Sequence, residues 1–168
     1  HFPGVPQCPI SCLPFWPVHK KETSDRPTRY DYGDGSEEPP AAFFGWSLQR
    51  RLQPDRLVIL GTSGSIWDHL FEGDDAFYEA GKAADDLTDA VKEKRVTAEH
   101  LVPLTPLLSA RLGCEVCLEL IPYARDSAEQ VELLRIMAGH VEAGDRVDLD
   151  VTHGFRHLPM LAILAALH

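Results

Sequence analysis

A hydroxyl, an imidazole, a glycine and a guanidinium lie within the five residues Thr152-His-Gly-Phe-Arg156. They follow an alternating, strand-like segment and precede a helix-like one, whose N-terminal amides favour anions. We expect Arg156 to bind a phosphate through two hydrogen bonds, Thr152 to donate to its oxygens, and Gly154 to let the backbone come close. An ordinary turn with a solvated arginine explains these residue types equally well.

A second loop, Gly61-Thr-Ser-Gly-Ser65, has glycines that let backbone amides converge on an anion. The hydroxyls of Thr62, Ser63 and Ser65 add further donors. The loop lacks the lysine of a nucleotide-binding P-loop and the full spacing of a dinucleotide-binding fingerprint, so alone it is better explained as a plain connection. Together with the first loop, it gives Gly61, Thr62, Ser63 and Ser65 as candidate ligand-binding residues.

Carboxylates and an imidazole near the first loop raise the question of a metal site. Asp148, Asp150 and His153 are chemically suitable ligands for a divalent ion. We favour a different role for Asp150, in which it accepts hydrogen bonds from amides of the following loop and fixes its shape. We therefore expect neither a metal nor a cofactor.

The cysteines form no evident site. Cys114 and Cys117 have a CxxC spacing, but residues three apart on a strand point to opposite faces. Cys8 and Cys12 lie in a proline-rich segment with no histidine cluster to complete a zinc set. We expect reduced thiols without a function.

Two segments match the spacing of arginine, four residues and histidine that one class of metal-free ribonucleases uses. They are Arg95-Val-Thr-Ala-Glu-His100 and Arg135-Ile-Met-Ala-Gly-His140. Such a spacing occurs readily by chance, and Arg135 and His140 would lie about 140° apart around a helix. We interpret both pairs as surface residues.

The elements that must position these loops alternate along the chain. The apolar patterns predict strands at 10–13, 56–60, 114–121 and 147–151, and helices from 41 to 53, 77–91, 101–112, 127–144 and from 158. Pro103 and Pro106 should interrupt the third helix, and the helix from Ser127 should bury Val131, Leu134, Ala138 and Val141. This order predicts an α/β fold with a Rossmann-like parallel sheet flanked by helices, whose ligands lie at the carboxyl ends of the strands.

Composition fits one globular domain, with 168 residues of which 44% are hydrophobic and 25% charged. Eight of the thirteen prolines fall in residues 1–40, so we divide the chain into an irregular segment, 1–40, and a Rossmann-like domain, 41–168. The net charge of −10 argues against binding duplex nucleic acid, which needs clustered basic residues.

The sequence also bears on where the protein acts in the cell. Four cysteines and no evident signal peptide favour the cytoplasm. The apolar run Leu158–Leu167 is half the length of a membrane-spanning helix. Because that run has no helix-stop signal, we expect a fragment that is truncated at its C-terminal end.

The segment Asp150-Val-Thr-His-Gly154 resembles the signature of the CRISPR-associated DxTHG-motif family, whose members carry a CARF domain. The likeness continues through Phe155-Arg-His-Leu-Pro-Met160, and Leu57-Val-Ile-Leu-Gly-Thr62 with Trp67 is similar to the family's second strand. The first 27 residues depart from the family pattern, because prolines occupy the place of a smooth first strand.

This resemblance implies a homodimer whose paired pockets bind a cyclic oligoadenylate, commonly cyclic tetra-adenylate, through Thr152, His153, Gly154 and Arg156. It further implies a CRISPR-associated antiviral protein in which ligand binding regulates an appended effector, often a ribonuclease, beyond His168. A ring nuclease that cleaves the messenger with help from His153, Ser63 or Ser65 is the alternative, and its catalytic residues are unknown. An unrelated Rossmann-like nucleotide enzyme is a third hypothesis.

Overall fold

The computed structural model describes Cys8, residues 10–12, Asp31, Gly33, Gly35 and residues 44–150. Its centre is a parallel sheet of four strands in the order β3-β2-β1-β4. The strands are β1 (Ile10–Cys12), β2 (Arg56–Gly61), β3 (Glu115–Leu120) and β4 (Leu149–Asp150). The expected α/β parallel architecture is thus confirmed.

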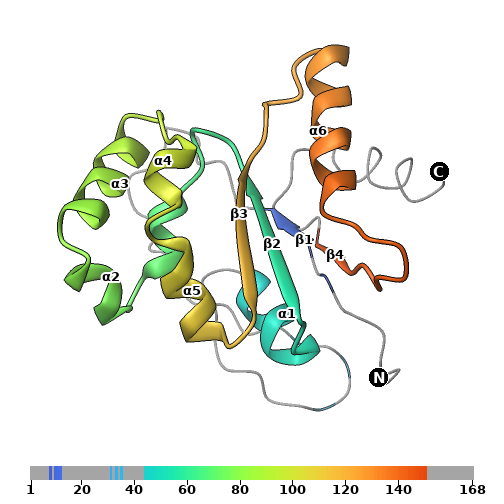
Figure 1. Ribbon diagram of the computed structural model, residues 1–168, viewed down its shortest axis with the longest axis horizontal. Coiled ribbons are helices and arrows are strands. Elements are labelled where there is room, and N and C mark those ends of the chain that lie inside the picture. Colours follow the sequence, from blue (N-terminus) through green and yellow to red (C-terminus); the bar gives the residue numbers. More distant parts are fainter. Residues whose placement is uncertain are drawn as a thin grey trace.

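Six α-helices and one 3-10 helix accompany the sheet in the described residues. They are α1 (Phe44–Leu52), η1 (Trp67–Phe71), α2 (Asp75–Glu79), α3 (Lys82–Lys92), α4 (Ala98–Leu101), α5 (Thr105–Leu112) and α6 (Ser127–Gly139). Figure 1 shows α2 to α5 on one side of the sheet and α6 on the other. The sheet therefore lies between helical layers, as in Rossmann-like folds.

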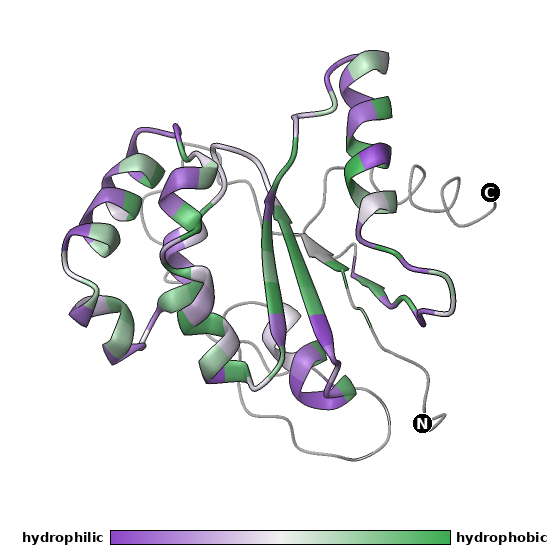
Figure 2. Ribbon diagram, in the orientation of Figure 1, coloured by the Kyte–Doolittle hydropathy of each residue, from purple (hydrophilic) through white to green (hydrophobic). Residues whose placement is uncertain are grey.

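Strand β2 separates two hydrophobic cores. Because successive side chains of a strand point to opposite faces, Leu57 and Ile59 enter one core, and Val58 and Leu60 enter the other. The strand is buried from Leu57 to Gly61, which explains the continuous apolar run in its sequence. In Figure 2 the middle parts of β2 and β3 are correspondingly hydrophobic.

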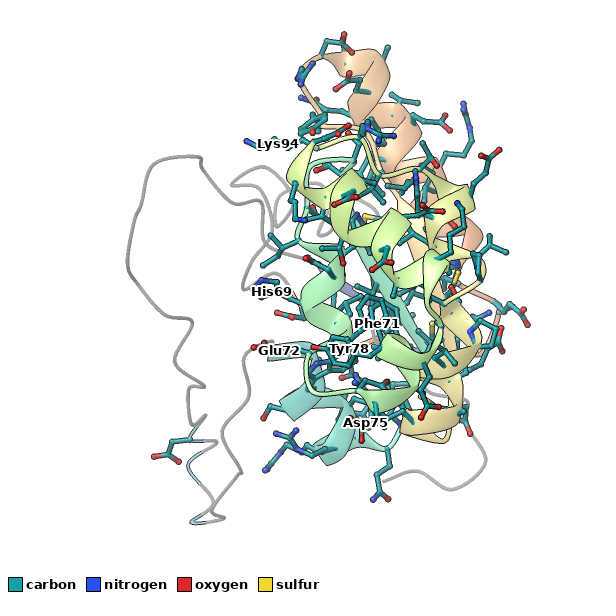
Figure 3. The ribbon with its side chains drawn as sticks, turned by 90° about the vertical axis from the view of Figure 1, so that its left-hand side faces the viewer. His69, Phe71, Glu72, Asp75, Tyr78 and Lys94 are labelled. Carbon is teal, nitrogen blue, oxygen red and sulfur yellow. The ribbon has the colours of Figure 1, made fainter. Side chains whose placement is uncertain are left out.

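The larger core lies under η1 and helices α2 to α5. Phe71 stacks on Phe77 with ring centroids 4.7 Å apart, and Tyr78 meets Phe77 edge-on. Figure 3 views this layer from outside and labels His69, Phe71, Glu72, Asp75, Tyr78 and Lys94. Tyr78 is largely exposed, so this aromatic group extends from the core to the surface.

Two helical predictions need correction. The stripe expected over 77–91 is divided between α2 and α3 at Gly81, whose φ of 55° breaks the helix. Helix α6 buries Leu133 and Met137, whereas Val131 and Val141 are 55% and 41% exposed, so the predicted inner face was wrong. The helix also ends at Gly139, five residues before the expected stop.

Other boundaries agree with the sequence. Pro103 lies between α4 and α5, and Pro106 occupies the first turn of α5, where a missing N–H costs no hydrogen bond. The short strand expected near residue 10 is β1, flanked by β2 and β4. No helix in the described part of the chain is long and apolar enough to cross a membrane.

Candidate functional site

All four strands end at the same edge of the sheet, because they are parallel. The chain builds β1, β2 and β3 in one direction across the sheet and then returns to place β4 on the other side of β1. This reversal makes the boundary between β1 and β4 a topological switch point. In open α/β sheets, ligands bind in the crevice at the carboxyl ends of the strands at such a point.

The Gly61–Ser65 loop leaves the end of β2 in a tightly fixed conformation. A Cβ atom on Gly61 would lie 2.6 Å from Cζ2 of Trp67, so only glycine lets the indole pack against this backbone. The Trp67 Nε1–H donates to the Thr62 carbonyl at 2.8 Å, and Trp67 is fully buried. The loop is thus held in place by the core beneath it.

The hydroxyls of Thr62 and Ser65 stabilise the loop itself. Both residues are 1% exposed. The Thr62 N–H donates to Ser65 Oγ at 3.0 Å, the two hydroxyl oxygens are 3.3 Å apart, and the Gly64 N–H donates to Thr62 Oγ1. Their geometry favours a structural role over direct contact with a ligand, which the sequence alone did not distinguish.

Ser63 is the hydroxyl of this loop that reaches the surface. Its Oγ lies 3.2 Å from the Tyr123 hydroxyl, which comes from the connection between β3 and α6. The Arg125 guanidinium lies over the Tyr123 ring, with its carbon 4.4 Å from the ring centroid. This arrangement places an aromatic ring, an exposed cation and a hydroxyl together near the carboxyl edge.

Sequence reasoning missed Tyr123 and Arg125. The available signal was an aromatic and a basic residue directly after a predicted strand, at the same sheet edge as the other candidate loops. It was overlooked because 60 residues separate Ser63 from Tyr123 in the chain. Pairing strand ends in the predicted parallel order would have brought the two loops together.

Asp150 is the last residue of β4, is 4% exposed, and lies in register with Ser11 of β1. Its position at the switch point is compatible with the proposed loop-shaping role, which stays a prediction. Thr152, His153, Gly154 and Arg156 lie outside the described residues, so their contacts also remain predictions. Asp148, one of the three residues considered as metal ligands, forms an ion pair in which its Oδ2 lies 3.4 Å from Arg146 Nε.

The arginine–histidine pairs behave differently from each other. His100 forms a capping box with Thr97 at the start of α4, and Arg95 is exposed. The His140 side chain is only 17% exposed and its Nε2 lies 3.3 Å from a Glu119 carboxylate oxygen. Describing His140 as a surface residue was therefore wrong, although Arg135 is indeed exposed.

A hollow of about 540 Å³ lies at the other end of the sheet, lined by Gln49, Arg50, Gln53, Pro54, Leu112 and Gly113. Pro54 and Gly113 precede β2 and β3, so this hollow is at the amino edge. Because ligands of parallel sheets bind at the carboxyl edge, we do not regard it as the main site.

Comparison with known proteins supports the fold class. A family model described as "CRISPR system endoribonuclease Csx1, CARF domain" matches residues 16–168. "CRISPR-associated protein MJ1674" of Methanocaldococcus jannaschii is 26% identical over 148 residues, covering 76% of this chain and 22% of that protein. The chain thus spans about a fifth of this relative's length. No solved structure matched.

Proposed function

Because the chain belongs to the family of Csx1 CARF domains, we propose that it binds a cyclic oligoadenylate at the carboxyl edge of its sheet and regulates an effector. Family membership makes it a CRISPR-associated sensor domain of the CARF type. Domains of this type generally sense cyclic oligoadenylates. The ligand, the residues that bind it and the coupled activity are the parts we propose.

The observation that carries the proposal is the end of β4 at Asp150, beside β1 at the topological switch point. Strand β4 ends at the carboxyl edge with Asp150, and the DxTHG-like segment starts at this residue. Strands β4 and β2 are two strand spacings apart, about 10 Å. A ligand of several nucleotides can therefore contact both the segment after Asp150 and the Gly61–Ser65 loop.

We assign the proposed contacts according to the chemistry of each group. Arg156, Thr152 and Gly154 bind a phosphate, with His153 as a further polar contact. Ser63 contributes an accessible hydroxyl, while Tyr123 and Arg125 offer flat surfaces on which an adenine can stack. Thr62 and Ser65 keep the loop in shape.

We further propose a homodimer. A ring of identical nucleotides has rotational symmetry, and an isologous dimer presents the same groups to it twice. A few arginine and hydroxyl contacts then suffice, although the chain has a net charge of −10. The effector is a coupled ribonuclease in this proposal, which is consistent with the family's description, and the protein acts in the cytoplasm.

Calorimetry with cyclic tetra-adenylate and cyclic hexa-adenylate tests the proposed sensor. We expect one ring per dimer, and at least about tenfold weaker binding for Arg156→Ala, because a charged hydrogen bond contributes about 1.5–3 kcal/mol. The matched control is Arg135→Ala, an exposed arginine that pairs with Glu132 on α6. If neither ring binds, or if both variants weaken binding equally, the proposal is wrong.

A ring nuclease in the same pocket is the second candidate, supported by the Ser63 hydroxyl and its contact with Tyr123. Such an enzyme would use a positioned polar group to assist attack by a ribose 2′-hydroxyl on the adjacent phosphate. Buried Ser65 is a poor candidate for this role. Chromatography of the ring after incubation separates the two functions, since a pure sensor returns it uncut and Ser63→Ala then changes nothing.

A further inference from the structure

Cys117, Glu119 and His140 bring three different ligand atoms together between the sheet and α6. Cys117 and Glu119 are two residues apart on β3, so their side chains point to the same face. His140 is the residue that caps the C-terminal end of α6. One sulfur, one nitrogen and one oxygen atom of these residues all lie within 4.8 Å of one another.

This spacing is close to that of a tetrahedral zinc site. With Zn–N and Zn–O bonds of about 2.0–2.1 Å and a Zn–S bond of about 2.3 Å, neighbouring ligand atoms are about 3.3–3.6 Å apart. His140 Nε2 and Glu119 Oε2 already lie 3.3 Å apart. The Cys117 Sγ lies within 4.8 Å of both atoms, so it would have to approach them by up to about 1.3 Å.

The surroundings hold His140 firmly. Its carbonyl accepts a 2.6 Å hydrogen bond from the Arg56 guanidinium and a weaker one from the Cys8 thiol at 3.7 Å. Arg56 is also paired with Asp145 at 3.1 Å. The backbone of the proposed ligand is thus tied to β2 and to the segment just before β1.

Nearby carboxylates and a helix end contribute negative charge at this cluster, and the Arg56 guanidinium contributes positive charge. The C-terminal end of a helix carries partial negative charge, and His140 lies there. Burial, followed by the carboxylates of Glu119 and Glu115 and the Cys8 thiol, raises the pKa of Cys117, while Arg56 lowers it. A bound divalent cation stabilises the thiolate form of a coordinating cysteine.

We propose that Cys117, Glu119 and His140 bind one Zn²⁺ ion, which joins β3 to the end of α6 and leaves one coordination position open. A thiolate and an imidazole select zinc over Mg²⁺ and Ca²⁺, which prefer oxygen ligands. Glu119, with a side chain 37% exposed, provides the side from which the ion enters. This site is separate from the loops at the carboxyl edge and does not depend on the proposed ring binding.

Calorimetry of metal-free, untagged protein with zinc chloride tests the proposal. We expect one ion per chain, and binding weakened by at least about 10- to 100-fold in Cys117→Ser and His140→Gln, since even supporting groups of metal ligands have effects of that size. Cys114→Ser is the matched control, because that partly buried thiol lies outside the cluster. It should bind zinc as the unaltered protein does.

A second measurement needs no variant. Cobalt added to the unaltered protein should give the absorption of a tetrahedral site together with a thiolate-to-metal band, and zinc should displace it. Circular dichroism shows whether each variant is folded, and Glu119→Gln replaces a variant that is not. The proposal is wrong if zinc fails to bind, if the thiolate band is absent, or if Cys114→Ser lowers affinity as much as Cys117→Ser.

Discussion

Replacing Gly61 by alanine should destabilise the protein through a clash with one identified ring. The new Cβ would lie 2.6 Å from Trp67 Cζ2 and 3.0 Å from Cε2, distances that force the indole or the strand to move. Overpacking of a buried site costs about 1–3 kcal/mol. A shifted indole also loses its hydrogen bond to the Thr62 carbonyl, about 1 kcal/mol.

We therefore expect Gly61→Ala to lower the free energy of unfolding by about 2–4 kcal/mol. For a chain of this size, that corresponds to a decrease in Tm of roughly 5–15 °C. Urea unfolding followed by circular dichroism measures the first quantity, and a thermal scan the second. The same variant should bind the proposed ligand more weakly, because the Gly61–Ser65 loop starts at this residue.

Gly139→Ala is the matched control. Gly139 lies at the end of α6 with no atom within 4 Å of an added Cβ, so alanine there should raise stability by up to about 1 kcal/mol. Trp67→Phe removes the ring atoms that clash with the new Cβ. The double variant Gly61→Ala with Trp67→Phe should therefore lose less free energy of unfolding than the two single variants together, by about 1 kcal/mol or more. Unchanged stability in Gly61→Ala, or strict additivity in the double variant, would refute this reasoning.

Three further predictions concern the effect of single substitutions on stability. Asp126→Ala should destabilise by about 1 kcal/mol in urea unfolding and Ser127→Ala by much less, because Asp126 caps α6. Arg56→Gln should cost about 2–3 kcal/mol in the same assay, since it removes the cation paired with the largely buried Asp145 carboxylate and leaves that carboxylate only the Glu142 N–H. Burial raises the pKa of Asp68, so its contribution to stability is present below about pH 4 and is lost as pH rises through the raised native pKa. Asp68→Asn should therefore be more stable than the unaltered protein at pH 7, an advantage that disappears at low pH and that pH-dependent unfolding measures.

The sheet was predictable chiefly through β2, which is buried on both faces. In β2, the uninterrupted Leu57-Val-Ile-Leu60 reports burial directly, and the following glycine marks the strand end. Alternation of strands and helices then leaves few topologies open. The strand at residue 10 was expected even among prolines.

Helix α6 shows where periodicity fails. Its sequence, Val131-Glu-Leu-Leu-Arg-Ile-Met137, has apolar residues on several faces, so more than one helical stripe fits. The core beneath it, formed by Val58, Leu60 and Ile10, selects Leu133 and Met137. That choice depends on tertiary packing, which a local pattern does not contain.

The site was only partly predictable for the same reason. Glycines and hydroxyls made the Gly61–Ser65 loop a candidate at the carboxyl edge, but their types did not show that Thr62 and Ser65 bond to each other. The Cys117, Glu119 and His140 cluster was hidden because His140, at the end of α6, is far in sequence from Cys117 and Glu119 on β3. Each such contact joins residues that only the fold brings together.

The contacts at the amino edge explain how two-residue β4 can be positioned accurately. Its own pairing with β1 covers only Ile10 with Leu149 and Ser11 with Asp150. Upstream, the Cys8 N–H donates to the Arg146 carbonyl at 3.0 Å and the Ile10 N–H to the Asp148 carbonyl at 2.9 Å. A slip of one residue would turn Asp150 to the other face of the sheet. The hydrogen bonds near Cys8, with the Arg56 pair to Asp145, therefore fix the register that delivers Asp150 to the switch point.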